Sequence, residues 1–344
     1  MSKVIKKVAI YPGYANMLKD QVFDLDSEVG RQLRGLPVLQ RYIALRDLLA
    51  QNGIELHTYD MYSDPKEIDV WLMLEMKPSR YLFMARHLIN PKKVIPIVIE
   101  PEIVLPWQWR YMRLWSRLHP IVLTWSPELV RSDKRFHRFY YAPFLFDVNK
   151  YEYYLAKPKK NLCMLMQSNK ASRVPGELYS LRREIIRYYE KRGDNLFDLY
   201  GFGWNTPNTQ HLGPSEPFYT PVHKGIADDK SETFAEYQFV FCIQNFVPAG
   251  DYESDVFMAM ATGAVPIFLP PADVDELIPA DAYINYSHFQ NLDELTAYLQ
   301  SIVGTEHYAA YRRRGWEYLN SEKFRPFTVQ QFAEDIHRSI QLAR

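Results

Sequence analysis

The sequence has few of the residues that build disulfide frameworks and metal sites. It contains two cysteines in 344 residues, Cys163 and Cys242, and both lie inside apolar runs. Such usage provides neither a disulfide scaffold nor a zinc site, and it is typical of a reducing compartment. The nine histidines are scattered without the spacing of metal ligands. We therefore expect no bound metal and no required cofactor.

An excess of charge of one sign is also missing. Lysine plus arginine (41) equals aspartate plus glutamate (41), so no global basic field indicates nucleic acid as a partner. Aromatic residues make up 15% of the chain, including 25 tyrosines. That content suits stacking on carbohydrate or nucleotide, and an aromatic-rich core explains it equally well.

Long hydrophobic runs are absent as well. No segment approaches the roughly 20 apolar residues of a membrane helix, and the first residues lack the apolar length and small-residue cleavage site of a secretory signal. We expect a cytoplasmic protein. The segment WQWRYMRLWSRLH, residues 107–119, leaves a peripheral membrane contact open.

The first half alternates between short apolar runs and segments with helical spacing, which predicts a mostly parallel sheet with helices on both faces. Strands are expected at residues 4–11, 54–59, 70–74, 94–99 and 121–125, and helices at 39–51, 81–88 and 107–118.

A polar, lysine-rich break at residues 150–160 precedes a second series of the same kind. Strands are expected at 161–166, 196–200, 239–243 and 265–269, and helices at 178–191, 256–261, 291–303, 308–320 and 328–342. We predict an α/β chain of two Rossmann-like domains that face each other across a cleft. Their expected bounds are 1–155 and 156–325, with a C-terminal helix at 326–344 that packs back toward the first domain.

The most informative segment is residues 237–269, YQFVFCIQNFVPAGDYESDVFMAMATGAVPIFL. A buried strand, a loop broken by proline and glycine, an apolar helix and a second buried strand follow one another there. Side-chain oxygens of Ser254 and Asp255 stand where they can cap the helix. The free N–H groups at such a helix start favour phosphate.

These residues carry a resemblance to glycosyltransferase family 10, the α-1,3/α-1,4-fucosyltransferases. The family has a strand ending in a Phe-Glu-Asn-type motif, then Tyr-x-Thr-Glu-Lys, an apolar helix and Gly-x-Val-Pro-Ile/Val. The matching segments here are Ile243-Gln244-Asn245, Tyr252-Glu253-Ser254-Asp255-Val256 and Gly263-Ala264-Val265-Pro266-Ile267, with Gln167-Ser168-Asn169, Arg173 and Phe197-Asp198-Leu199-Tyr200-Gly201 upstream. The resemblance covers about residues 160–303.

What the resemblance implies is a GT-B, inverting glycosyltransferase, fucosyltransferase-like, that uses a nucleotide-diphosphate sugar, GDP-fucose in the family. The second domain would hold the donor and the first a glycan or other saccharide acceptor. Glu100, at the end of a first-domain strand, matches the family's base position, with Glu102 in reserve. The alternative for Glu100 is a loop carboxylate that caps a helix or pairs with a cation.

The donor-binding residues that the resemblance implies also have structural alternatives. Arg173 would neutralise the diphosphate or be a surface arginine, and Asn245 would contact the donor or be a turn residue. Tyr252 would line the nucleotide pocket or be a hydrophobic staple. Asp255, beside Ser254, would hold the ribose hydroxyls or cap the helix.

The sequence departs from the family pattern at the phosphate. The family's lysine is Val256 here, and the glutamate before Asn245 is Gln244. Three consequences of the missing lysine are open: a cation from elsewhere in the chain replaces it, the donor binds differently, or activity is weakened. The candidate cations are Lys170, Arg182, Arg183 and Lys224. A donor sugar other than fucose, or a nucleotide base other than guanine, is compatible with this change. The alternative function is a catalytically degenerate relative that binds a glycan or a partner.

Overall fold

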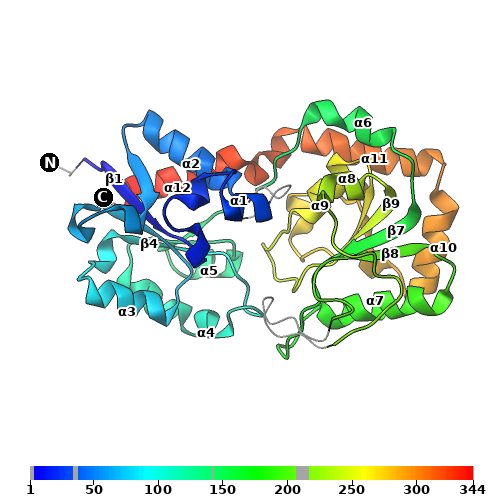
Figure 1. Cartoon of the computed structure of the whole chain (residues 1–344), viewed down its shortest axis with the longest axis horizontal. Helices are drawn as coiled ribbons and strands as arrows, with labels where there is room; N and C mark the ends of the chain where they lie inside the picture. The colour runs from blue at the N-terminus through cyan, green and yellow to red at the C-terminus, as the bar shows by residue number, and fades with distance from the viewer. Residues whose placement is uncertain (1–3, 34–37, 142, 207–216, 344) are drawn as a thin grey trace. The chain divides into compact units, whose positions relative to one another are not determined.

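The computed structural model describes residues 4–33, 38–141, 143–206 and 217–343. The chain divides into two compact units (Figure 1). Unit 1 comprises Met1–Leu145, Gly250–Tyr252 and Arg325–Arg344, and unit 2 comprises Phe146–Ala249 and Glu253–Phe324. The three-residue segment Gly250–Tyr252 therefore packs with unit 1, although its sequence neighbours on both sides belong to unit 2.

Unit 1 is built on a six-stranded sheet in which every neighbouring pair is parallel, in the order β2-β1-β3-β4-β5-β6. Its strands are β1 (Lys7–Tyr11), β2 (Glu55–Thr58), β3 (Val70–Leu74), β4 (Val94–Val98), β5 (Val122–Thr124) and β6 (Phe136–Arg138). Its helices are α1 (Glu28–Gln32), α2 (Gln40–Gln51), α3 (Pro78–Arg86), α4 (Pro106–Trp115), α5 (Pro127–Ser132) and α12 (Val329–Leu342). All five residues of β3 and of β4 are buried, as expected of strands covered on both faces.

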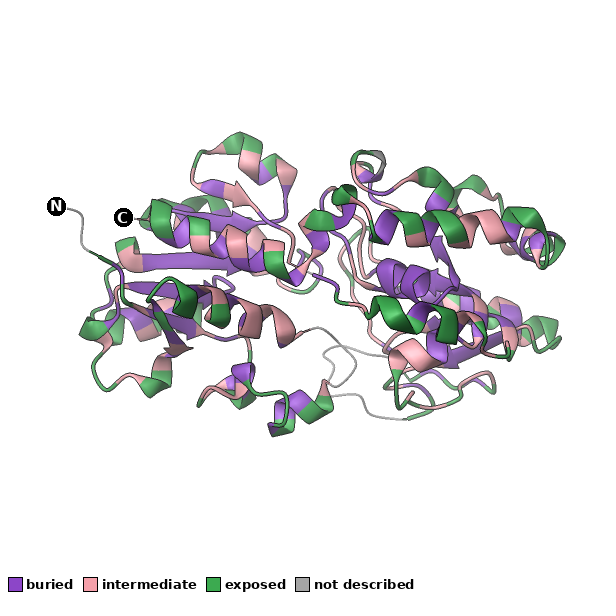
Figure 2. Ribbon diagram, turned by 90° about the horizontal axis from the view of Figure 1, so that it is seen from above, coloured by how far each residue is buried: buried purple, intermediate pink, exposed green. Residues whose placement is uncertain are grey.

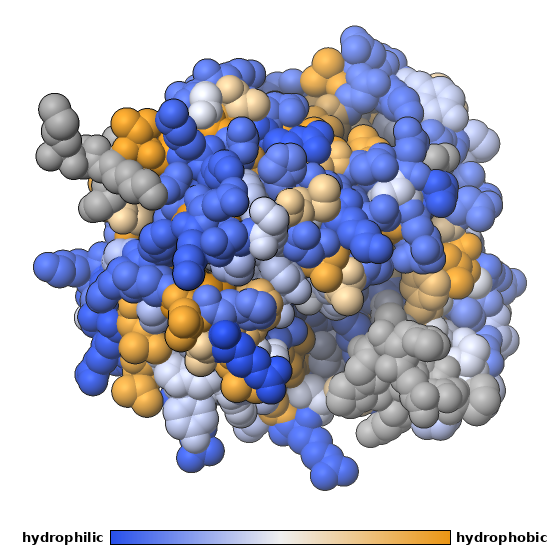
Figure 3. Space-filling view, turned by 60° about the vertical axis from the view of Figure 1, so that its left-hand side comes forward, coloured by the Kyte–Doolittle hydropathy of each residue, from blue (hydrophilic) through white to orange (hydrophobic). Residues whose placement is uncertain are grey.

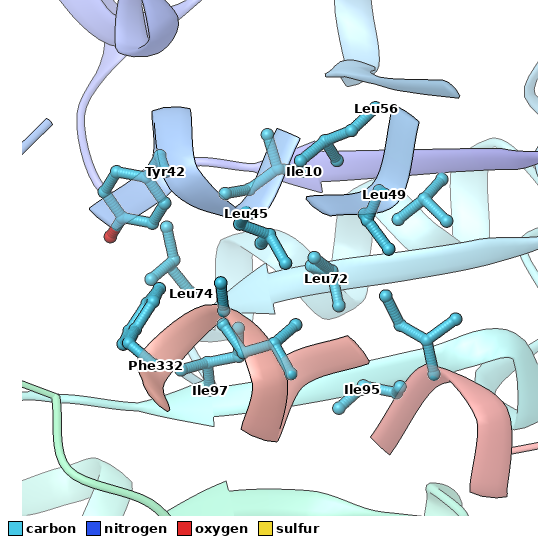
Figure 4. Close-up of a cluster of buried hydrophobic side chains, with 14 of the residues drawn as sticks. Ile10, Tyr42, Leu45, Leu49, Leu56, Leu72, Leu74, Ile95, Ile97 and Phe332 are labelled. Carbon is cyan, nitrogen blue, oxygen red and sulfur yellow. The ribbon is translucent and has the colours of Figure 1, made fainter. Parts of the chain in front are cut away.

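The largest cluster of buried apolar residues in unit 1 joins the sheet to α2 and α12. Leu45 and Leu49 of α2 meet Ile10, Leu72 and Ile95 of the strands (Figure 4). The same cluster takes in the apolar face of α12 through Phe332, Ala333, Ile336 and Ile340. Burial on this scale stabilises by roughly 1.5–3 kcal/mol per large side chain, so the last helix of the chain is an integral part of unit 1.

Unit 2 is built on a five-stranded parallel sheet in the order β11-β10-β9-β7-β8. Its strands are β7 (Asn161–Met166), β8 (Phe197–Tyr200), β9 (Tyr237–Cys242), β10 (Val265–Phe268) and β11 (Ile284–Asn285). Its helices are α6 (Tyr151–Leu155), α7 (Tyr179–Arg192), α8 (Lys230–Phe234), α9 (Asp255–Ala261), α10 (Leu292–Ile302) and α11 (Glu306–Leu319). In both sheets the strands are buried, while the covering helices expose one side to solvent (Figure 2).

The predicted α/β class and the parallel sheets are confirmed. Of the four edge strands, β2 and β8 were predicted, whereas β6 and β11 were not. The sequence of β6, Phe-His-Arg, has one buried residue in three, and β11 has only two residues. Segments this short and this polar carry no period that separates a strand from a loop.

Hydrophilic side chains dominate the face shown in Figure 3, where apolar ones lie in small separate groups. Within the described residues, no helix is long and apolar enough to cross a membrane. The tryptophans of the 107–119 segment pack against neighbouring aromatic rings: Trp109 lies 4.9 Å from Trp125 between ring centroids, and Trp115 lies 4.5 Å from Tyr81.

Candidate active site

In unit 2, the direction of chain winding reverses between β7 and β9. The chain passes from β7 to β8 on one side and then crosses to β9 on the other side of β7. Open α/β sheets bind ligands at such a switch point, outside the carboxyl ends of the strands. Gln167 directly follows β7 and Asn245 lies three residues after β9, so both stand at this edge.

Asp255, the first residue of α9, is the centre of the polar cluster at this edge. Its side chain is only 10% exposed. One carboxylate oxygen accepts a hydrogen bond from Gln167 Nε2 at 2.9 Å, and the other accepts one from Lys230 Nζ at 2.5 Å. Each carboxylate oxygen keeps a second lone pair, so Asp255 can still accept a hydroxyl hydrogen of a ligand.

Lys230 is a functional candidate that the sequence analysis missed. It is the first residue of α8 and its side chain is 18% exposed. It lies 25 residues before Asp255 in the chain, and only the fold brings the two together. Val256, which occupies the family's lysine position, is 1% exposed within α9. A cation therefore does stand beside the acidic residue, but it comes from a different element.

Three of the four cations that the sequence offered as substitutes make other contacts, and one of them, Lys224, pairs with Asp198 at 3.3 Å. Arg182 is 1% exposed and donates from Nε and Nη2 to the Ile243 carbonyl. Arg183 donates to Asn169 Oδ1 and to the Lys170 carbonyl, both at 3.0 Å. Arg182 thus holds the loop after β9, and Arg183 holds the loop after β7.

Glu253 was also missed, and it fixes the loop that ends in Asp255. Its carboxylate accepts the Asn245 amide hydrogen and faces Arg182. Burial raises the pKa of Glu253, and the Arg182 guanidinium opposes that shift. Asn245 in turn accepts a hydrogen bond from the Leu178 amide through its carbonyl at 3.0 Å. The backbone of Asn245 is thus tied down on both sides.

Gln167 is held in place by a close approach of the turn after β8. Trp204 Nε1 donates to its carbonyl at 2.7 Å. Gly201 has φ +130, and a Cβ atom there would overlap the Gln167 carbonyl. Only glycine fits this position, which gives a physical reason for the glycine that ends the Phe-Asp-Leu-Tyr-Gly segment.

The remaining predicted donor residues lie in different surroundings. Arg173 is exposed in the loop after β7. Ser254 stands at the N-cap position of α9 but makes no side-chain cap hydrogen bond. Tyr252 is 2% exposed and belongs to unit 1, where its ring packs against Tyr140 and Phe327.

Unit 1 has its own switch point, between β1 and β3, because the chain passes from β1 to β2 on one side and to β3 on the other. A pocket of about 260 Å³ lies there. Tyr11, Tyr14 and Tyr59 contribute aromatic rings to its wall, and Lys77 and Arg80 contribute cations. Flat rings beside hydrogen-bonding groups suit a saccharide.

Glu100 follows β4 by two residues and is partly exposed. Its backbone carbonyl accepts from Trp109 Nε1 at 2.9 Å, and its charge acts on the Tyr14 hydroxyl, whose pKa is raised mainly by burial and further by Glu100. Glu102 is exposed. Glu100 therefore acts electrostatically on a residue in the wall of the unit 1 pocket.

A second carboxylate, Glu75, lies behind Glu100 and was missed. It directly follows β3 and is 4% exposed. The rule that selected Glu100, a carboxylate at the carboxyl end of a buried strand, would have found it. Within the residues described, no group of three or more histidine, cysteine, aspartate or glutamate side chains is arranged to hold a metal ion.

Comparison with known proteins relates part of the chain to one family. Residues 198–335 match the model of the glycosyltransferase family 10 (fucosyltransferase) C-terminal domain. An α-(1,4)-fucosyltransferase of Arabidopsis thaliana is 31% identical over 85 residues, which are 24% of this chain and 21% of that protein. The match thus spans about a fifth of the relative's length.

Solved structures share the whole fold. An α1,3-fucosyltransferase with GDP has a TM-score of 0.57 at 14% identity, over 99% of this chain and 92% of that one. The α1,3-fucosyltransferase with GDP-fucose gives 0.55 at 15%, with coverages of 99% and 92%. An α-glucosyltransferase bound to UDP and DNA gives 0.54 at 12%, with coverages of 97% and 99%. At these identities the likeness shows the fold. The chain therefore has the GT-B fold, and one part of it, residues 198–335, is similar to the C-terminal domain of glycosyltransferase family 10 (fucosyltransferase).

Proposed function

We propose that the chain is an inverting glycosyltransferase that transfers fucose from GDP-fucose to a hydroxyl group of a saccharide acceptor. The acceptor oxygen attacks the anomeric carbon of the sugar while the bond from that carbon to the diphosphate breaks. GDP leaves with the bonding electron pair, and the hydroxyl proton passes to the Glu100 carboxylate. One displacement inverts the anomeric centre.

The observation that carries this proposal is the cluster of Gln167, Asp255 and Lys230 at the switch point of unit 2. Asp255 would accept the ribose hydroxyls through its remaining lone pairs. Lys230 would turn its ammonium group toward the diphosphate, where negative charge grows as the sugar leaves. Arg173, exposed in the loop after β7, would add a second positive charge.

The acceptor would bind in the unit 1 pocket. A volume of about 260 Å³ is enough for a single sugar ring, and the tyrosines of its wall supply both stacking surface and hydroxyl groups. Glu100, which acts electrostatically on Tyr14 of that wall, would then be the base nearest to an acceptor hydroxyl. General base catalysis of this kind contributes typically about 10²–10⁴-fold.

Calorimetric titration with GDP, GDP-fucose, UDP and UDP-sugars tests the donor half. We expect GDP and GDP-fucose to bind and UDP to bind more weakly. Binding of UDP alone would correct the base and the sugar, and binding of no nucleotide would refute the enzyme proposal. A transfer assay with an acceptor panel and GDP-fucose then tests the reaction itself.

A catalytically degenerate binding protein is the second candidate, and the burial of Val256 favours it. The position that supplies a phosphate cation in the family contributes only to the core here. In that case the nucleotide titrations give no heat, while saccharides still bind to the unit 1 pocket. The two functions therefore differ in the donor experiment.

A further inference from the structure

Glu75 combines burial with an unusual backbone. Its φ is +67, in the left-handed region that residues with a side chain rarely adopt. The backbone still pairs with the neighbouring strand, because the Glu75 amide donates to the Ile97 carbonyl at 2.9 Å. A strained conformation persists only where the surroundings enforce it. The contacts of the side chain show what enforces it here.

The carboxylate of Glu75 is surrounded by N–H donors. Oε1 accepts the amide hydrogens of Ile99 at 3.1 Å and of Glu100 at 3.0 Å, and Oε2 accepts from Gln108 Nε2 at 2.7 Å. The orientation of the Gln108 amide is itself fixed, because its Oε1 accepts the Met76 amide hydrogen at 2.5 Å. These hydrogen bonds join the ends of β3 and β4 to α4, and one of them holds the backbone of Glu100.

The charged and titratable groups that act on Glu75 come from four other elements. Arg80 of α3 donates to the Glu75 carbonyl at 3.3 Å, while its guanidinium still attracts the side chain. Glu100, after β4, repels it. The charge of Glu75 contributes to raising the pKa of Tyr14, after β1, and of Tyr42 of α2. Burial outweighs the hydrogen bonds and raises the pKa of Glu75 to about 7.

We propose that Glu75 is a positioning residue for Glu100: its carboxylate holds the Ile99 and Glu100 amides and places a second negative charge behind the base. Repulsion between the two carboxylates is mutual, so an ionised Glu75 favours proton uptake by Glu100. This inference rests on the proposed function, in which Glu100 accepts the proton of the acceptor hydroxyl.

The exchange of the two side chains provides a matched test. In Glu75→Gln, the introduced amide nitrogen faces Gln108 Nε2. Both groups are hydrogen-bond donors, so the hydrogen bond between the two side chains is lost. The double variant Glu75→Gln with Gln108→Glu restores the hydrogen bonds, because the carboxylate at position 108 then accepts from both the Met76 amide and the introduced amide at position 75. Glu128→Gln, at an exposed carboxylate of unit 1, is the control.

We expect Glu75→Gln to lower kcat by about 10- to 100-fold, with a smaller change in KM, because the base is displaced. We also expect the acid limb of its kcat profile to move to lower pH. The double variant should recover most of kcat, and Glu128→Gln should match wild type. Wild-type kcat and an unshifted acid limb in correctly folded Glu75→Gln would overturn the proposal.

A carboxyl ¹³C NMR titration separates this inference from the proposed function. Glu75 should titrate near neutral pH, and Glu100 should titrate at lower pH in Glu75→Gln than in wild type. Signals for the two residues are assigned from the Glu75→Gln and Glu100→Gln variants. An unchanged Glu100 titration overturns the inference even in an active enzyme, whereas a protein without transferase activity but with the coupled titration refutes only the proposed function.

Discussion

The two switch points of this molecule hold buried carboxylates in opposite electrostatic surroundings. In unit 2, Asp255 makes an ion pair with Lys230 and a hydrogen bond with Gln167. In unit 1, the side chain of Glu75 accepts hydrogen bonds from neutral amides, and its pKa is raised to about 7. The same position in a parallel sheet therefore supports two kinds of chemistry.

The difference lies in what each carboxylate can do at neutral pH. A carboxylate paired with an ammonium group offers a hydrogen-bond acceptor beside a cation, which suits a nucleotide with a ribose and a diphosphate. A carboxylate buried among amides exchanges protons near neutrality and influences a neighbouring carboxylate, which suits acid–base chemistry. The proposed function thus assigns donor binding to unit 2 and proton transfer to unit 1.

The largest expected effect tests the acid–base half. Glu100→Gln should lower the rate of transfer by about 10²–10⁴-fold, since the amide cannot accept the proton. GDP binding should be unchanged, because the proposed donor contacts lie in unit 2. Transfer assays and calorimetry on the same preparation measure both. Unaltered turnover would contradict the assignment of Glu100 and direct attention to Glu102.

The pH dependence of stability tests the surroundings of Glu75. Its pKa is raised from 4.5 to about 7 in the folded protein, so the unfolded chain releases the proton more readily. Its contribution is fully present below pH 4.5 and is lost as pH rises to about 7. The full loss is about 3–4 kcal/mol, the shift multiplied by roughly 1.4 kcal/mol per unit.

Chemical denaturation of wild type and Glu75→Gln at about pH 4.5 and about pH 7.5 measures this difference. Glu75→Gln should be spared the loss, so its free energy of unfolding relative to wild type should rise by about 3 kcal/mol between the two pH values. Parallel pH curves for the two proteins would show that Glu75 titrates normally.

The donor half is tested by Lys230→Gln. Loss of a charge-assisted hydrogen bond of about 1.5–3 kcal/mol should weaken GDP binding by roughly 10- to 100-fold. Lys191→Gln, on the exposed end of α7, is the control. The double variant Lys230→Gln with Asp255→Asn removes the buried unpaired charge, so it should regain stability without regaining affinity. GDP affinity equal to wild type in Lys230→Gln would assign the diphosphate to another cation.

A smaller effect is expected from Gly201→Ala. The added Cβ would push the Gln167 carbonyl away and loosen the Gln167–Asp255 hydrogen bond, which lowers GDP affinity by about 1 kcal/mol, or roughly fivefold. Gly193→Ala is matched to it, since Gly193 also has positive φ but has nothing within 4 Å of its Cβ position. Equal GDP affinities in the two variants would show that the close approach at Gly201 is unimportant.

The sequence predicted the regular parts of the fold well because apolar runs and helical spacing are local signals. The expected strands at 70–74 and 161–166 coincide with β3 and β7. The edge strands β6 and β11 and the short helices α5, α6 and α8 were not predicted, since two or three residues of strand and fewer than two turns of helix carry no clear period. The start of α8 matters most among these, because it carries Lys230.

For the candidate site, the sequence selected Asp255 from its position at a helix start and Glu100 from its position after a buried strand, both with the support of the family pattern. It did not select Lys230 or Glu75. The partner of a side chain 25 residues away depends on how the chain winds, and the depth of a carboxylate depends on what covers it. Neither quantity is encoded in a local pattern.

By itself, the sequence determined the α/β class, the parallel strands and the resemblance to family 10, because each depends on residue types at short spacing. Only the tertiary structure decided that a lysine from α8 stands beside Asp255 and that Tyr252 packs with unit 1. The burial of Glu75 behind Glu100 is equally a tertiary fact. Such contacts join elements that are distant in the chain. The electrostatic interactions of these groups are strong because the groups are buried, and burial exists only after the sheet and its covering helices have packed.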